Sequence, residues 1–233
     1  RWNFDWSSDV CSSDLAMIAD ILARNGPLQH AEPVPAEVVA LHEGRVPGLI
    51  LDFWENHGIG ELGDGLLKLC MPRMFAEPLG LLLKDDPEFD GRTVAVAYGP
   101  FGNLVLWNEV HGLGLLSHPG AMIDAPFFGR DVSALDADRV LFDYVLGNDP
   151  RFMDVFDDDG REMHDRARAE LGELPPGLIY GLMPADAFLE VGVAQLQVVV
   201  AEEWMTDRFL GQVYMLQDLM GDRLNIRPVG APS

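Results

Sequence analysis

Two runs of β-forming residues near the middle of the chain constrain the fold most strongly. Thr93–Tyr98 (TVAVAY) and Gly102–Val110 (GNLVLWNEV) are rich in branched and aromatic side chains, and Gly99-Pro100 lies between them. Valine, tyrosine and tryptophan favour strands, and a glycine-proline break between two such runs is typical of a turn. We therefore expect these two segments to form a hairpin or a pair of adjacent strands.

Segments with helical spacing of apolar residues lie on both sides of this pair. The spacing and the flanking glycines and prolines predict helices over Ala16–Asn25, Ala36–Glu43, Val46–His57, Arg73–Leu83, Ser133–Gly147, Arg161–Leu171 and Glu202–Met220. Short apolar runs predict further strands over Leu66–Cys70, Gly112–Met122, Leu178–Met183 and Leu189–Val193, while Leu196–Val200 is either a strand or the lead into the last helix. Helices mixed with a few strands in this order indicate an α+β fold.

The same pattern suggests how the chain is divided. We expect a mixed α/β domain over residues 16–130, a connecting helix or linker over 131–150, and a small α+β C-terminal domain over 151–222. The last residues, 223–233, are predicted to be a flexible tail, because chain ends are often poorly ordered.

The first fifteen residues need separate treatment. Asp5–Leu15 (DWSSDVCSSDL) matches the translation of a common short-read sequencing adapter, so we interpret residues 1–15 as a non-native, adapter-derived segment and exclude them from the fold prediction. Cys70 is then the only native cysteine. A single thiol fits a reducing compartment, so we expect a cytoplasmic protein.

The chain is strongly acidic. It has 16 basic and 38 acidic residues, and removing the one basic and three acidic residues of 1–15 leaves 15 against 35, a net charge of −20. Affinity for nucleic acid and for anionic lipid comes largely from lysine and arginine. The charge therefore argues against direct binding to nucleic acid or membranes and favours a basic protein partner.

No pattern in the sequence indicates catalysis or a bound cofactor. The six histidines (His30, His42, His57, His111, His118 and His164) lack metal-ligand spacing, and no phosphate-binding loop or nucleophile elbow is present. Cys70 lies in an apolar run, which is typical of a buried thiol. Asp157–Asp159 precede Gly160 but lack the spacing of a calcium loop. We therefore expect no enzyme activity, no cofactor and no metal site.

Three segments resemble known families. Pro47–Pro72, with its proline-led helix and glycine-rich turn, and Val94–Asn108 (VAVAYGPFGNLVLWN) resemble the GAD-like domain. Leu171–Leu219 resembles the small C-terminal domain that accompanies it in type VI secretion DNase-immunity proteins, through Gly172, Leu174, Tyr180-Gly181, Pro184-Ala185, Gly192, Leu210 and Leu216-Gln217. The resemblance implies a GAD-like domain followed by an immunity-type domain.

The resemblance also implies a function. It predicts a non-catalytic immunity protein that binds and neutralises a cognate toxin, a basic nuclease effector, in the cytoplasm. We expect such a partner to contact the loop Glu55–Asp64 and the segment Asp157–Gly160, which we call the acidic break. The predicted contact residues are Glu55, Glu61, Asp64, Asp157, Asp158 and Asp159. The alternative is a ligand-sensing or scaffold module without a toxin partner; an enzyme ranks third.

Overall fold

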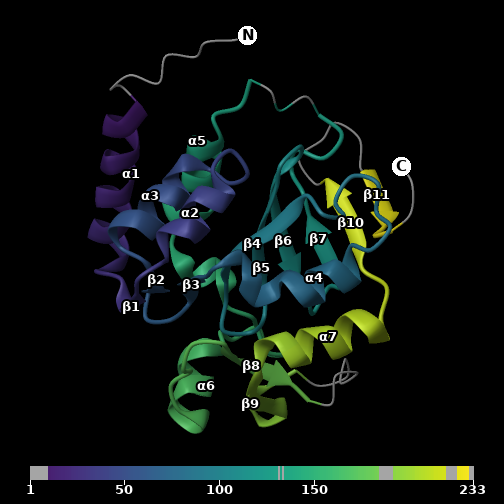
Figure 1. Ribbon diagram of the computed structural model, residues 1–233. Helices are drawn as coiled ribbons and strands as arrows, with labels where there is room; N and C mark the ends of the chain where they lie inside the picture. Colours follow the sequence, from purple (N-terminus) through teal and green to yellow (C-terminus); the bar gives the residue numbers. More distant parts are fainter. Residues whose placement is uncertain (1–9, 131, 133, 184–190, 219–224, 231–233) are drawn as a thin grey trace.

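A long mixed sheet forms the centre of the molecule (Figure 1). The computed structural model describes residues 10–130, 132, 134–183, 191–218 and 225–230. Within these residues the sheet has nine strands in the order β1-β2-β3-β4-β5-β6-β7-β10-β11. They are β1 (Gln29–Glu32), β2 (Ile59–Leu62), β3 (Leu67–Leu69), β4 (Thr93–Tyr98), β5 (Leu104–Asn108), β6 (Gly112–Ser117), β7 (Met122–Asp124), β10 (Met215–Asp218) and β11 (Asn225–Pro228). Neighbouring strands are antiparallel, except that β10 runs parallel to β7.

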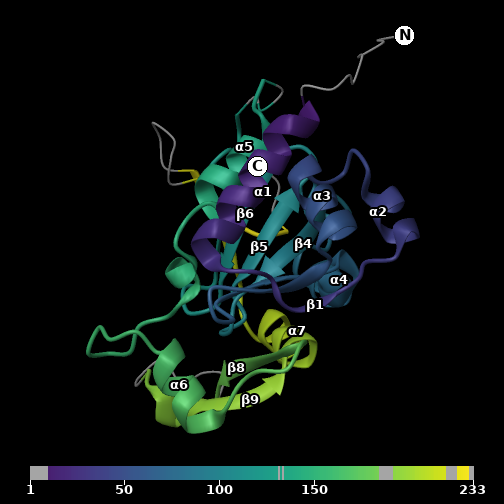
Figure 2. The same ribbon diagram turned by 90° about the vertical axis from the view of Figure 1, so that its left-hand side faces the viewer.

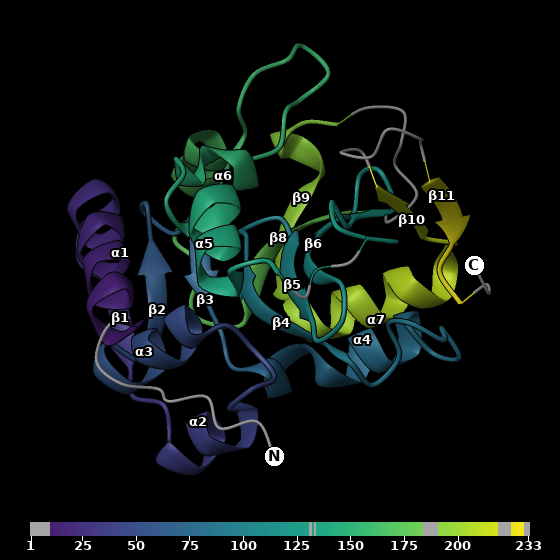
Figure 3. The ribbon, with the colours of Figure 1, turned by 90° about the horizontal axis from the view of Figure 1, so that it is seen from above.

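Helices cover both faces of this sheet (Figures 1 and 3). On one face lie α1 (Val10–Asn25), α3 (Gly48–Asn56) and α5 (Ala137–Leu141), with α2 (Ala36–His42) packed on α3. On the other face α4 (Ala76–Leu82) packs against α7 (Ala201–Gly211). Short helical turns complete the chain at η1 (Pro72–Phe75), η2 (Phe142–Leu146), η3 (Pro150–Met153) and η4 (Val193–Gln195).

The hairpin predicted from the two central β-forming runs is confirmed as β4 and β5. Along β5, Leu104 and Leu106 pack toward α4 and α7, whereas Val105 and Trp107 pack toward α1 and α3. Side chains alternate between the faces of a strand, so a strand that is covered on both faces is apolar throughout. This explains why every residue of β5 is buried, and it confirms the α+β fold.

A smaller unit lies beyond one end of the main sheet (Figures 1 and 2). Its two strands, β8 (Leu178–Leu182) and β9 (Leu196–Val200), pair antiparallel and pack against α6 (His164–Leu171). It has its own apolar core, made by Phe101, Met163, Ala167, Leu174, Tyr180, Val193 and Leu196. Phe101 belongs to the β4–β5 turn, so this core also anchors the small unit to the main sheet.

The end of the chain differs from the sequence prediction. The helix expected over Glu202–Met220 stops at Gly211, and the chain continues as β10. The apolar spacing suggested one helix, but Leu216 is buried in β10, which pairs with β7, while Val213 is 70% exposed. Likewise, residues 225–228 of the expected flexible tail form β11, paired with β10.

The structure also differs from one strand prediction and one turn prediction. No strand is present at residues 191–193 of the run expected over Leu189–Val193, since η4 begins at Val193; residues 189 and 190 lie outside the described part. Ile59–Leu62, expected to lie in a glycine-rich turn, is strand β2. The turn begins one residue later, at Gly63.

The first helix begins inside the segment attributed to the adapter. Helix α1 starts at Val10, although the sequence predicts a start at Ala16. Its buried apolar side chains, Ile18 and Ile21, lie beyond that segment. The adapter origin of residues 1–15 stays a prediction.

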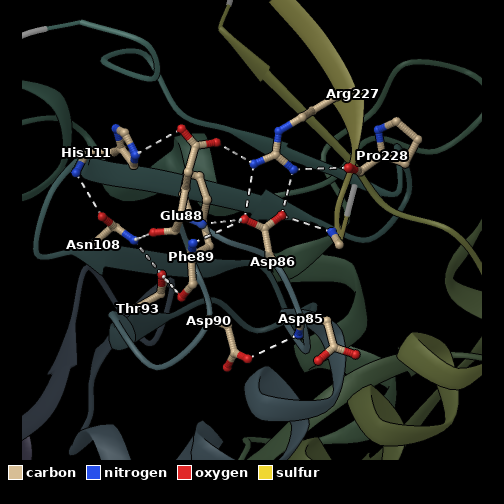
Figure 4. Close-up of polar contacts among 11 residues, drawn as sticks. Asp85, Asp86, Glu88, Phe89, Asp90, Thr93, Asn108, His111, Arg227 and Pro228 are labelled. Atoms are coloured by element: carbon tan, nitrogen blue, oxygen red, sulfur yellow. Dashed lines mark hydrogen bonds and ion pairs between the residues drawn. The ribbon is translucent and has the colours of Figure 1, made fainter. Parts of the chain in front are cut away.

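A buried ion network fastens the last strand to the rest of the molecule (Figure 4). The guanidinium of Arg227 on β11 donates to both carboxylate oxygens of Asp86, at 2.6 and 3.1 Å, and to Glu88 at 2.8 Å. The side chains of Arg227 and Asp86 are 8% and 0% exposed. Burial alone would raise the pKa of Asp86, but the hydrogen bonds from Arg227 and from the amides of Gly230 and Glu88 lower it below its usual value.

Candidate functional site

A groove runs between the β1–β3 end of the main sheet and the small C-terminal unit. It consists of three adjoining hollows of about 510, 270 and 400 Å³. The first two share Asp64 and His164, and the second and third share His30, Glu61, Lys68 and Pro176. We call this the interlobe groove. It brings together residues that are far apart in the sequence.

The centre of the interlobe groove is a buried ion pair. Lys68 on β3 donates to Glu61 on β2 at 2.8 Å, and the side chains are 3% and 11% exposed. Lys68 also donates to the carbonyl of Leu174 at 3.0 Å. His30 Nδ1 lies 3.4 Å from the second oxygen of Glu61. Each charge of the pair therefore lies beside an opposite charge. The hydrogen bond from Lys68 to the Leu174 carbonyl also joins the small unit to the main sheet.

A tyrosine makes a second link across the groove. The hydroxyl oxygen of Tyr98 on β4 accepts a hydrogen bond from the amide of Gly177 at 3.0 Å. Burial raises the pKa of Tyr98, so its phenol is neutral at physiological pH. Tyr98 also forms one wall of the 400 Å³ hollow, with Met71 and Met74 beside it. That hollow thus has apolar walls and a few polar groups, a combination typical of ligand pockets.

Two of the four non-glycine residues with positive φ angles in the described part of the chain lie at the rim of the groove. His30 and Asp64 have φ angles of +50° and +56°, in the left-handed region that side chains other than glycine rarely adopt. Close by, Gly58 has φ +83°, and a Cβ there would lie 2.1 Å from the carbonyl oxygen of Glu32. Strained residues persist where the surrounding structure holds them, often at functional sites. The geometry therefore marks the groove as the candidate functional site.

The groove contains two of the acidic residues predicted to contact a partner. Asp64 is exposed at its rim, whereas Glu61 is buried and paired with Lys68. Sequence reasoning missed Lys68, His30 and the Leu174 carbonyl. The available signal was a lysine inside the apolar run LLKLC, at a position where a strand residue is buried.

The acidic break forms a separate structure. Asp157 is buried, and its carboxylate accepts from the backbone amide of Arg161 and the side chains of Arg161 and Arg166, contacts that lower its pKa despite partial desolvation. Asp158 is exposed, and its carboxylate accepts from the amide of Val191 at 3.0 Å. Asp159 is also exposed and pairs with Arg161. Asp157 therefore holds the loop in shape, and Asp158 and Asp159 face solvent.

The third predicted region, at Glu55, lies on α3 beside an acidic cluster. Glu55 is exposed. The pKa of Asp52 nearby is raised, mainly by burial, next by the charge of Asp14 and then by the charge of Glu55. Asp138 on α5 accepts a hydrogen bond from the amide of Leu49 at 2.7 Å and so caps the start of α3. Burial, together with Asp14, Asp136 and Asp52, raises the pKa of Asp138 to about 6, against the lowering effect of the Leu49 amide. The predicted residues thus lie in three places and form no single patch.

This cluster makes stability depend on pH. Because the folded-state pKa of Asp138 lies above its ordinary value of 3.8, the folded protein holds more protons than the unfolded chain between about pH 4 and 6, so stability falls as pH rises through this range. We expect Asp138→Asn to raise the free energy of unfolding by about 1–2 kcal/mol at pH 7.5, and by much less at pH 4.5. Urea unfolding at both pH values measures the difference. Asp165→Asn, at an 84% exposed side chain, is the control; an equal change in both variants would contradict the prediction.

Three further features of the described residues concern the cysteine, metal binding and membranes. Cys70 is completely buried, which confirms the expected buried thiol, and burial raises its pKa. Among the described residues no group of three or more histidine, cysteine, aspartate or glutamate side chains is arranged to hold a metal ion. In the same residues, no helix has the length and apolar character needed to cross a membrane.

Comparison with known proteins supports the fold and one domain. The crystal structure of Atu4351 from Agrobacterium tumefaciens is similar, with a TM-score of 0.84 at 24% identity, covering 91% of this chain and 97% of that chain. No curated protein matches the sequence. Residues 16–116 match the GAD-like domain family. They include the segments that carried the resemblance to this domain, so the chain contains a GAD-like domain over residues 16–116.

Proposed function

We propose that this protein is a non-catalytic immunity protein that binds and neutralises a cognate type VI secretion toxin, a nuclease, in the cytoplasm. The observation that carries the proposal is the GAD-like domain at residues 16–116, from a domain family associated with immunity proteins. The resemblance of Leu171–Leu219 to the accompanying immunity-type domain supports it from the sequence.

The charge of the protein supports the choice of partner. A nuclease must present basic groups to its phosphate substrate. A protein with a net charge of −22 is attracted to such a surface, and complementary charge speeds association. The same charge disfavours direct contact with nucleic acid, so the proposed inhibition works through the toxin and not through its substrate.

The test uses the toxin encoded by the neighbouring gene. Cells that express this toxin are expected to die, and co-expression of the present protein is expected to restore growth. The purified proteins should co-elute on size-exclusion chromatography, and the complex should weaken as salt rises. Unchanged killing together with separate elution would overturn the proposal.

One observation favours a second function, that of a ligand-sensing module. The 400 Å³ hollow beside Tyr98 has a volume and wall composition suited to a small molecule. A thermal-shift screen of metabolites tests whether the protein is a ligand sensor. A saturable rise in melting temperature that Tyr98→Ala abolishes, with no toxin complex, would favour the sensor over the immunity protein.

A further inference from the structure

We propose that the segment Phe152–Phe156 and the cleft behind it form the docking surface for a basic protein partner. The inference rests on the proposed function, because it assigns the toxin-binding face of an immunity protein. The segment runs from the end of η3 into the chain before α6, which Figures 2 and 3 show projecting from the molecule on the side away from α2 and α4. We call it the aromatic loop.

Two aromatic side chains of this loop are exposed. Phe156 is 58% exposed and Phe152 is 38% exposed, whereas Met153 between them is buried. The exposed part of each ring is apolar surface that the free protein leaves in contact with water. Aromatic residues of this kind supply much of the binding energy when a partner covers them.

Behind the two aromatics lies an apolar cleft of about 350 Å³. Its walls include Leu115, Pro119, Val155 and Val191, together with Phe152 and Phe156 themselves. The cleft therefore joins the aromatic loop to the end of the main sheet. A partner side chain that enters it would be surrounded by apolar groups contributed by both parts of the molecule.

The loop is held in a defined shape before any partner arrives. One carboxylate oxygen of Asp154 accepts from the amides of Val155, Met163 and His164. Phe156 also forms an isolated antiparallel bridge with Glu162. A surface ordered in advance loses less conformational entropy on binding, so the exposed aromatics are presented at little entropic cost.

The charge around the loop selects the partner. Residues 149–166 contain seven acidic residues and three arginines. Asp158 is anchored beside the cleft by its two hydrogen bonds with Val191, and Asp159 is 73% exposed. An apolar cleft beside a segment of net negative charge fits a basic surface that carries a protruding apolar side chain. The occupant is therefore a basic protein such as a nuclease toxin, and not an acidic peptide or a second copy of this chain.

The experiment measures binding of the neighbouring gene's toxin to the full-length protein and to three variants. We expect Phe152→Ala/Phe156→Ala to weaken binding about 100-fold or more, because two aromatic anchors are lost. Asp158→Asn/Asp159→Asn should slow association about three- to tenfold at low salt and much less at high salt. Leu41→Ala/Leu81→Ala, at residues 67% and 41% exposed on α2 and α4, is the matched control and should bind like the parent.

The outcomes separate the two proposals. Thermal unfolding confirms that each variant is folded. If the parent protein binds the toxin and the aromatic double variant binds equally well, the docking surface is wrong while the immunity function stands. An equal loss in the control variant would likewise overturn the assignment to the aromatic loop. If the parent protein binds no toxin, both proposals fail.

Discussion

Arg227→Met is expected to lower the free energy of unfolding by about 3–5 kcal/mol. The substitution leaves the carboxylate of Asp86 buried without its partner, and it removes the contact that joins β11 to the turn before β4. Chemical denaturation at pH 7 measures the loss. Arg151→Met is the control, because its ion pair with Glu162 is exposed on both sides, and it should cost less than about 1 kcal/mol.

The cause can be tested with a second substitution. If the buried unpaired charge is responsible, Asp86→Asn should recover part of the stability in the Arg227→Met background. The lowered pKa of Asp86 means that its contribution is present above the ordinary carboxyl pKa and is lost as pH falls. A cost of less than about 1 kcal/mol for Arg227→Met would show that the network contributes little.

Lys68→Met is expected to have a comparable effect, about 3–5 kcal/mol. It leaves Glu61 buried without a counter-charge and removes the donor to the Leu174 carbonyl. Since Leu174 belongs to the small unit, amide exchange there should speed up more than in β4 and β5. Hydrogen exchange with mass spectrometry measures this local effect.

The matched control is Lys84→Met, at an exposed lysine, which should change stability by no more than about 0.5 kcal/mol. The double variant Glu61→Met/Lys68→Met removes both charges and should be more stable than Lys68→Met alone. If Lys68→Met speeds amide exchange equally in the small unit and in β4 and β5, the Lys68–Glu61 ion pair stabilises the protein as a whole but does not specifically join the two units.

The parts of the fold that the sequence predicts are those fixed by local spacing. The β4–β5 hairpin follows from two β-forming runs and a glycine-proline turn, and α3 follows from apolar residues at helical spacing ahead of Gly58. By contrast, Val213 and Leu216 fit the stripe of one long helix, and only the pairing of β10 with β7 decides against it. Secondary-structure propensity is readily overridden by such distant contacts.

The candidate site, too, is predicted only where it depends on local sequence and not on distant contacts. Acidity and the position of Asp64 are visible in the sequence, but the burial of Glu61 depends on Lys68 and on a carbonyl 106 residues further along the chain. Asp157 belongs to a run of three acids, which suggests a solvated patch; its contacts with Arg161 and Arg166 make it a structural residue instead. Spacing along the chain does not reveal which member of a charged run turns inward.

The order of strands has a consequence for synthesis on the ribosome. Strand β7 ends at Asp124, but its neighbour β10 begins only at Met215, after the whole small unit has been made. Until then a growing chain presents β7 as an open edge, and open edges are prone to pair with other chains. The sheet is complete only when β11 has left the exit tunnel, pairs with β10 and brings Arg227 to Asp86. A message truncated before this point would therefore yield an unfinished sheet and not a smaller working protein.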